Sequence, residues 1–330
     1  MSLVTIFGGS GFIGRSLIRR LTDSGHHIRV VSRRAGASSG LVTFVSGDIA
    51  DAASVDAAVR GADTVVLLVT GGGARWADFE RDVVRGTRSV IEACERHHVG
   101  RVLYTSSIAA LYLGAGGSID ESAGCDPYPD RRSLYSRGKI AAERVVRDGS
   151  VPWVILRPGV VMGREGVLNH AGLGMWPSDL CCIGYSHGTN PLPFVLVDDV
   201  AAALAAAIDA PVEGETFNLA GDVFMSAREF IDIVCQQSLR RFRFYATSPA
   251  RTQSIDVAKW LIKIAARKQE NFFPSYRDLL SNSLATQLDC SRAKTLLGWS
   301  PNADPLVFVQ EAITPHLAPI PAGDLRLSMA

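Results

Sequence analysis

The sequence lacks the features that mark membrane, nucleic-acid-binding and repeat proteins. Its 330 residues contain no apolar run long enough to cross a bilayer, no internal repeat, and a formal net charge of only +1. The first absence argues against an integral membrane protein, and the near-zero charge argues against nucleic acid as a partner. With 47% hydrophobic and 20% charged residues, the composition is that of a soluble globular protein with a full core.

Cysteine is scarce, and its spacing is uninformative. The six cysteines form no Cys-x-x-Cys pair and none lies near histidine at a zinc spacing. The adjacent Cys181 and Cys182 do not suit a disulfide. The first apolar run also begins almost at Met1, which leaves no room for a signal peptide. We therefore expect reduced thiols, no metal site and a cytoplasmic protein.

The most informative stretch that is present runs from Val4 to Leu21. An apolar run over 4–7 predicts a buried parallel strand, a glycine-rich turn follows, and apolar residues then recur at helical spacing. This context makes a glycine motif indicate dinucleotide binding, because backbone N–H groups and the helix N-terminus approach a pyrophosphate. The cofactor contacts expected here are Gly8, Gly11, Phe12, Ile13 and Gly14.

A second absence bears on which dinucleotide binds. Enzymes that use the unphosphorylated cofactor usually place a carboxylate at the end of the second strand. Here that end reads Ser32-Arg33-Arg34, and no acidic residue occurs between Gly25 and Gly47. Two guanidinium groups suit a 2′-phosphate, so NADP(H) is favoured, with NAD(H) as the alternative if the arginines are ordinary solvated charges.

Strand and helix signals alternate through the first half of the chain. Apolar runs at 28–32, 42–45, 64–69, 101–105 and 153–156 predict further strands, with helices at 51–60, 79–97 and 134–147 between them. This alternation predicts an α/β fold of the Rossmann type, with a doubly wound parallel sheet. Further cofactor contacts are expected after the third and fourth strands, at Asp48, Ile49, Val69 and Thr70.

The alternation weakens after the sixth strand. We expect residues 1–163 to form the dinucleotide-binding domain, with 190–220 returning to it. Residues 164–189 and 221–330 are expected to form a smaller lobe that covers the substrate.

Two features carry the predicted chemistry. Tyr135 and Lys139 are four residues apart and therefore share one helix face, where the cation is expected to lower the pKa of the phenol. Ser107 follows the fifth strand, at the sheet edge where ligands bind in open parallel sheets. A hydroxyl there can hold a substrate oxygen beside Tyr135.

Together these motifs resemble the extended short-chain dehydrogenase/reductase family, in its 3β-hydroxysteroid dehydrogenase-like and dihydroflavonol reductase-like branch. The resemblance covers almost the whole length. Besides Gly8–Gly14 and Tyr135/Lys139, the matching stretches are Gly47-Asp48-Ile49, Gly86-Thr87, Tyr104-Thr105-Ser106-Ser107, Arg157-Pro158, Val197-Asp198-Asp199-Val200-Ala201, Phe217-Asn218-Leu219 and Leu297-Gly298-Trp299-Ser300-Pro301.

The resemblance implies catalytic roles for Tyr135, Lys139 and Ser107. Tyr135 would exchange a proton with the substrate oxygen, Lys139 would also bind the nicotinamide ribose, and Ser107 would position the substrate, with Ser106 or Thr105 able to share that role. The family pattern also implies a homodimer. The remaining implied cofactor contacts are Thr105, Tyr135, Lys139 and Pro158. The chain departs from the family at Phe7 and Val83.

The substrate is expected to be a small or lipophilic ketone or secondary alcohol. No carboxylate follows Ser107 to support dehydration, and the motifs with which sugar-nucleotide members bind their ligands are not matched. The alternatives are a nucleotide-sugar epimerase or reductase, and a non-catalytic cofactor-binding scaffold. Either pocket or core can explain the apolar residues Leu111, Tyr112, Leu113, Met162, Leu173, Met175 and Trp176.

One segment stands apart from this chemistry. Residues 255–268 alternate apolar side chains with lysine and arginine, as a basic amphipathic helix does. Such a stripe more often packs on the protein's own core, so peripheral membrane contact is the less favoured alternative.

Overall fold

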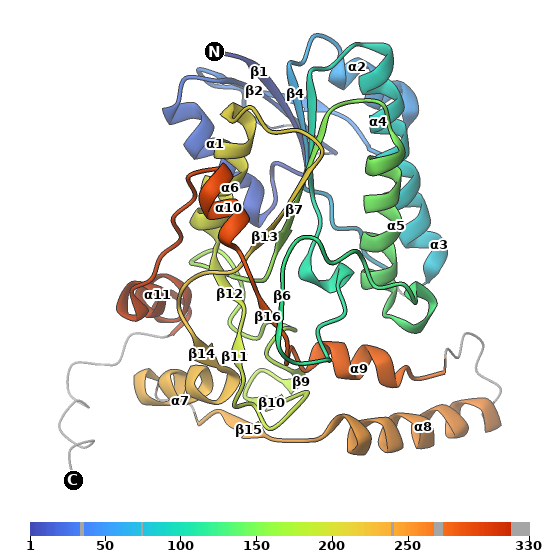
Figure 1. Ribbon diagram of the computed structural model, residues 1–330, viewed down its shortest axis with the longest axis vertical. Helices are drawn as coiled ribbons and strands as arrows, with labels where there is room; N and C mark the ends of the chain where they lie inside the picture. The colour runs from blue at the N-terminus through green and yellow to red at the C-terminus, as the bar shows by residue number, and fades with distance from the viewer. Residues whose placement is uncertain (34–35, 74, 239–240, 267–272, 318–330) are drawn as a thin grey trace.

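The computed structural model describes residues 1–33, 36–73, 75–238, 241–266 and 273–317. Its centre is a parallel sheet of seven strands in the order β13-β7-β5-β4-β1-β2-β3 (Figure 1). The chain builds outward from β1 to β3, then crosses back to β4 and builds the other side. This reversal confirms the predicted doubly wound α/β fold. The strands are β1 (Leu3–Phe7), β2 (His27–Ser32), β3 (Val42–Ser46), β4 (Thr64–Leu67), β5 (Arg101–Thr105), β7 (Trp153–Pro158) and β13 (Glu215–Leu219).

Helices cover both faces of the sheet (Figure 1). On one face α1 (Phe12–Asp23) packs with α6 (Val197–Asp209), and on the other lie α2 (Ala52–Val59), α4 (Gly86–Arg96) and α5 (Leu134–Asp148). Because both faces are covered, β1 buries Val4 and Ile6 in one hydrophobic cluster and Phe7 in the other. This explains why the strand appears in the sequence as a continuous apolar run.

The first six strands of the sheet were predictable from such runs, although several boundaries differ, and two differences bear on the site. The strand expected over 64–69 ends at Leu67, so Val69 and Thr70 lie in the loop beyond it. The helix expected over 79–97 consists of α3 (Trp76–Phe79), a π-helical segment η1 (Glu80–Arg85) and α4.

The sequence did not predict the seventh strand, β13, as a strand. It has only five residues, and Glu215 and Asn218 interrupt its apolar pattern. Asn218 is nevertheless fully buried, because its backbone N–H donates to Glu121 at 3.1 Å and its side-chain amide to the Asp289 carbonyl at 3.4 Å. Long-range hydrogen bonds thus engage the backbone N–H and the side-chain NH2 of a residue that local pattern assigns to the surface, while its side-chain oxygen has no partner among the described residues.

A third hydrophobic cluster lies below the large sheet in Figure 1, centred on Phe194, Phe230 and Phe308. Short strands and helices surround it. The strand pairs and triplet are β8 (Val160–Met162) with β12 (Phe194–Leu196), β11 (Pro191–Leu192) with β14 (Met225–Ser226), β6 (Ser118–Ile119) with β16 (Gln287–Leu288), and β10 (Cys181–Ile183) between β9 (Met175–Ser178) and β15 (Arg243–Tyr245). The helices are α7 (Ala227–Gln237), α8 (Pro249–Ala265), α9 (Tyr276–Asn282), α10 (Ser291–Leu296) and α11 (Pro305–Ala312), with 3₁₀ turns η2 (Ile108–Ala110), η3 (Pro129–Arg131) and η4 (Thr314–His316).

The contribution of β13 to stability can be tested by truncating its central side chain. Phe217 is fully buried in the cluster shared with α1 and α6. Phe217→Ala should lower the free energy of unfolding by about 3–5 kcal/mol, because it removes buried apolar surface and leaves a cavity. Urea unfolding measures the change. The matched control Phe224→Ala, at a residue 72% exposed, should change stability by less than about 0.5 kcal/mol. Equal effects would show that β13 does not belong to the cooperative core.

Candidate active site

A cleft of about 1010 Å³ opens where β1, β2 and β4 end, at the point where the strand order reverses. Eight of the predicted cofactor contacts line it, with others that the sequence did not single out. The predicted ones are Gly8, Gly11, Ser32, Arg33, Asp48, Ile49, Val69 and Thr70; the additional ones include Ser10, Gly47, Ala50, Gly71, Gly72, Arg81 and Asp82.

The glycine turn shapes the floor of this cleft. Gly8 adopts φ +84°, in the left-handed region, and its carbonyl accepts the Gly11 N–H at 3.0 Å. A Cβ on Gly14 would lie 2.4 Å from the Gly9 oxygen, so α1 approaches the turn too closely for any side chain there. The backbone N-terminus of α1 therefore stands open to the cleft, and the turn fits a dinucleotide pyrophosphate.

The other predicted cofactor residues lie outside the lining of the cleft. Phe12 instead borders a second, smaller cavity of about 220 Å³. Ile13 packs against the hydrophobic cluster of α1, and Pro158 pairs in register with Leu219 inside the sheet. Thr105 is buried and contributes its carbonyl to the neighbouring site rather than its side chain to the cleft.

The end of β2 carries the expected positive charge. Ser32 and Arg33 both line the cleft, whereas Arg34 lies outside the described residues. The structure adds Arg81, from the π-helical segment, which pairs with Asp82 at 2.6 Å. Two arginines and two carboxylates, Asp48 and Asp82, therefore share the cleft lining. Arg81 was missed because the sequence assigns it to an ordinary helix, and helical periodicity carries no signal for a π-helical turn.

Tyr135 and Ser107 lie together beyond β5. Tyr135 is the second residue of α5, whose first turn is capped by Ser133, and its phenol lies close enough to Ser107 for that hydroxyl to lower its pKa in part. The Ser107 oxygen also accepts the Ala109 N–H at 3.1 Å, which orients the serine at the start of η2. The Tyr135 residue is 36% exposed, so part of it remains accessible although protein atoms surround its hydroxyl.

The expected lowering of the Tyr135 pKa is wrong for this structure. Burial around the phenol raises the pKa of Tyr135, and the hydrogen bond with Ser107 offsets only part of that effect. The Lys139 ammonium lies 5.9 Å from the centre of the Tyr135 ring and donates to other groups. Tyr135 is therefore held as a neutral phenol at neutral pH, ready to donate a proton.

Lys139 lies one helical turn after Tyr135 and is only 1% exposed. Its Nζ donates to the Thr105 carbonyl at 2.8 Å and to the Val69 carbonyl at 3.5 Å. Burial lowers the pKa of Lys139 to about 8, although the negative charge of Glu143 acts in the opposite direction. Because Val69 also lines the large cleft, this ammonium joins the cleft to the Tyr135 site.

A buried carboxylate, Glu143, lies one helical turn after Lys139 on α5. Glu143 accepts two hydrogen bonds from Arg157, at 2.9 and 2.7 Å, and one from Ser106 at 2.6 Å. Burial would raise the pKa of Glu143, but the Arg157 guanidinium and the Ser106 hydroxyl together hold it below its usual value. The Ser106 hydroxyl is thus engaged inside the protein, and it is Ser107 that meets Tyr135.

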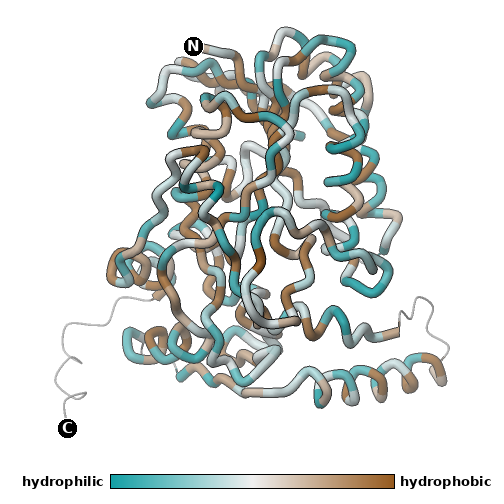
Figure 2. Tube along the Cα trace, viewed as in Figure 1, coloured by the Kyte–Doolittle hydropathy of each residue, from teal (hydrophilic) through white to brown (hydrophobic). Residues whose placement is uncertain are grey.

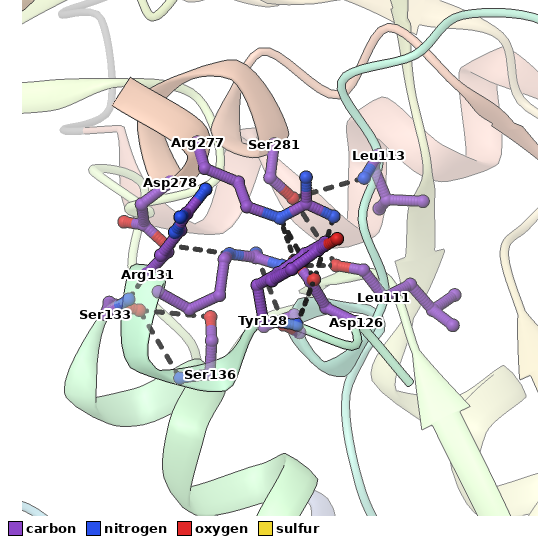
Figure 3. A network of polar contacts seen from close by, with 12 residues as sticks. Leu111, Leu113, Asp126, Tyr128, Arg131, Ser133, Ser136, Arg277, Asp278 and Ser281 are labelled. Carbon is purple, nitrogen blue, oxygen red and sulfur yellow. Dashed lines mark hydrogen bonds and ion pairs between the residues drawn. The ribbon is translucent and has the colours of Figure 1, made fainter. Parts of the chain in front are cut away.

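A second ionic network fastens α9 to the start of α5 (Figure 3). Asp126, whose side chain is fully buried, accepts from Arg132 at 2.8 Å and from Arg277 at 2.9 Å. Asp278 accepts from the Arg132 guanidinium at 3.0 Å and from the Ser133 N–H at 2.9 Å. Since Ser133 caps α5, residues of α9 help set where that helix begins. Local sequence patterns do not reveal the links between α9 and the start of α5, because those partners are about 150 residues apart.

The fold and this geometry define a dinucleotide-binding protein with a serine–tyrosine–lysine site beside its cleft. The model of the NAD dependent epimerase/dehydratase family matches residues 4–220. The chain belongs to this family, which confirms the resemblance to extended short-chain dehydrogenases/reductases.

Two relatives illustrate the similarity in sequence. The chain is 32% identical over 171 residues to the 2-alkyl-3-oxoalkanoate reductase of Stenotrophomonas maltophilia (strain K279a), covering 48% of this chain and 51% of the relative. It is 36% identical over 158 residues to a 3 beta-hydroxysteroid dehydrogenase/Delta 5-->4-isomerase of Mycobacterium tuberculosis (strain CDC 1551 / Oshkosh), covering 43% and 41%. The matches thus span about half the length of these curated relatives, or less.

The likeness in fold extends over almost the whole chain. The structure of MoeE5 in complex with UDP-glucose and NAD superposes with a TM-score of 0.71 at 22% identity, covering 94% of this chain and 97% of the other. At this identity the likeness shows the shared fold alone.

The buried network around Asp126 yields a stability prediction. Burial alone would raise the pKa of Asp126, but hydrogen bonds from Arg277, the Tyr128 N–H and Arg132 hold it below its usual value. Asp126→Asn should lower the free energy of unfolding by about 3–5 kcal/mol at pH 7, because it leaves two arginines without their shared anion. Urea unfolding measures this loss.

The pH dependence and a surface pair provide the controls. Because the folded-state pKa of Asp126 is depressed, its contribution is present at neutral pH and is lost as the pH falls through that value. Wild type and variant should therefore converge in strong acid. Asp130→Asn, at an exposed pair with Arg137, should cost less than about 1 kcal/mol. An Asp126→Asn protein as stable as wild type would contradict the role assigned to this network.

Proposed function

We propose that the protein is an NADP(H)-dependent oxidoreductase that interconverts a ketone and a secondary alcohol on a small or lipophilic substrate. The observation that carries the proposal is that Tyr135 and Ser107 come together beside a buried Lys139, at the edge of a cleft with a dinucleotide-binding turn. The cofactor would supply or accept the hydride. The chain's residues supply the proton and hold the reacting oxygen.

The proton in this scheme comes from Tyr135. Because the raised pKa keeps the phenol neutral, it can donate its proton to a carbonyl oxygen as that oxygen gains negative charge. Ser107, oriented by the Ala109 N–H, provides a second hydroxyl at the same oxygen. The positive charge of Lys139 one turn away stabilises the phenolate that remains after transfer. In the oxidative direction the same groups run the step in reverse.

The substrate class draws support from the relatives rather than from the pocket. Leu111, Leu113, Met162 and Leu173 are at most 2% exposed and belong to the third hydrophobic cluster, so they are core residues rather than an open pocket lining. The two relatives described above are named for a 3-oxoalkanoate and a 3 beta-hydroxysteroid. Both names describe a carbonyl or alcohol on a largely apolar carbon skeleton.

A nucleotide-sugar epimerase or reductase is the second candidate. It is favoured by the family description and by the fold likeness to a protein solved with UDP-glucose. Incubation with NADPH and panels of ketones and nucleotide sugars separates the two candidates. Net oxidation of NADPH by apolar ketones supports the reductase, whereas sugar interconversion without net cofactor turnover supports the epimerase. A non-catalytic scaffold would show neither, and it would have no need of Ser107, Tyr135 and Lys139 together.

Removal of one oxygen atom tests the proton donor. Tyr135→Phe should lower kcat with the substrate identified by the panel by about 10²- to 10⁴-fold, because the ring remains but the proton is lost. Cofactor binding, followed by nucleotide fluorescence, should stay within a fewfold of wild type. Tyr245→Phe, at a tyrosine 48% exposed on β15, controls for loss of a phenol elsewhere. Undiminished turnover by Tyr135→Phe would refute the proposed mechanism.

Cofactor choice is tested at the end of β2. Arg33 lines the cleft at the end of β2, and no carboxylate occurs at the end of that strand, which suits a 2′-phosphate. Arg33→Asp should weaken NADPH binding by at least about tenfold, the loss of one charge-assisted contact, and should improve NADH binding. Titration of both cofactors measures the ratio, with Arg29→Ala as a control because that arginine donates to carbonyls of α2 and its end instead. An unchanged NADPH affinity would refute the assignment.

A further inference from the structure

The helix α8 extends along the lower edge of the molecule, with α9 above it in this view (Figure 1). Ser248 caps its start and Pro249 occupies its first turn, so the sequence sets where the helix begins. Thr252 is its one fully buried residue, although the helix runs from Pro249 to Ala265. From residue 261 to 266 every position is exposed.

Hydrophobic and hydrophilic residues alternate along α8 (Figure 2). Ile255, Leu261 and Ile262 are 45%, 55% and 68% exposed. Ile255 and Ile262 are seven residues apart and share one face, and Leu261 points about 100° further round the helix. An apolar stripe that packed on the core of the protein would be buried. The prediction that this segment packs in that way is therefore wrong over the described residues 255–266. Residues 267 and 268, the last two of the predicted helix, lie outside the described residues.

Positive charge is concentrated around these apolar side chains. Residues 241–266, which comprise β15 and α8, carry five basic residues and a single acidic one, Asp256. The segment therefore has a net charge of +4 in a chain whose total is +1, so the rest of the chain is net negative. The five cations are Arg241, Arg243, Arg251, Lys259 and Lys263.

Aromatic side chains accompany both ends of this surface. Tyr245, just before α8, is 48% exposed, and Phe273, which packs edge-on against Trp260 with ring centres 5.2 Å apart, is 61% exposed. Tyrosine and tryptophan favour the boundary between lipid and water, because each has an apolar ring and a polar atom. The described part of the chain has no helix long and apolar enough to span a bilayer, so any contact would lie on the surface.

We propose that the α8 surface, formed by residues 241–266, docks the protein on an anionic lipid bilayer. The apolar residues Ile255, Leu261 and Ile262 would enter the interface while the lysines and arginines contact acidic headgroups. The positive charge complements acidic headgroups, and it disfavours a two-fold contact of α8 with itself. A two-fold contact of α8 with itself would bring a +4 segment against an identical +4 segment. The proposal does not depend on the reaction that the enzyme catalyses.

Co-sedimentation of the full chain with vesicles tests this surface. We expect binding to phosphatidylcholine vesicles that contain about a third phosphatidylglycerol, and at least tenfold weaker binding to pure phosphatidylcholine. Lys259→Glu and Lys263→Glu should each weaken binding by at least about fivefold, the effect of one cation near an anionic surface, and high salt should do the same. Leu261→Glu with Ile262→Glu should reduce binding to the level seen with neutral vesicles.

A matched variant shows whether the effect belongs to α8. Leu306 is 72% exposed on α11, so Leu306→Glu makes the same change at an exposed leucine elsewhere and should leave binding intact. Circular dichroism checks that each variant is folded. The proposal would be overturned if the protein bound neutral and acidic vesicles equally or bound neither. It would also be overturned if Leu306→Glu lost as much vesicle binding as the α8 variants do. A dimer, seen by light scattering without vesicles, that Ile262→Glu dissociates would overturn it as well.

Discussion

The buried ammonium of Lys139 is the interaction on which the rest of the site depends. It donates hydrogen bonds to the carbonyls of Thr105 and Val69, which lie at the end of β5 and just beyond the end of the neighbouring strand β4. The carboxylate of Glu143, one turn further along α5, also acts on its charge. A cation in such a place is costly unless each partner is in position. Its neighbours therefore tie together the cofactor cleft, the sheet edge and the helix that carries Tyr135.

Much of this was predictable because it is local. The glycine motif of the first turn is recognisable because a strand precedes it and a helix follows it, and the turn lines the cleft. Ser107 and Tyr135 were likewise placed by a strand end and by helical spacing, and the structure brings the two side chains together. Short-range pattern thus predicts most of the sheet and which polar groups meet at its edge.

The features that local patterns did not predict depend on contacts between residues far apart in the sequence. The pKa of Tyr135 follows from burial by distant segments, and the ties from Asp278 to the start of α5 link positions about 150 residues apart. Arg81 reaches the cleft from a π-helical turn that periodicity does not reveal. Conversely, Leu111 is apolar, as a residue that lines a substrate pocket would be, but it is buried in the core. Composition alone does not separate those two roles.

The central claim is that Lys139 is held as a buried, perturbed cation beside the phenol. The chain has only five lysines, so nitrogen NMR of protein labelled at lysine Nζ resolves each one in a pH titration. The account predicts that one signal titrates near pH 8, as burial requires, and that it disappears in Lys139→Arg. If all five signals titrate at the ordinary lysine value, about 10.4, the buried cation at the centre of this account does not exist.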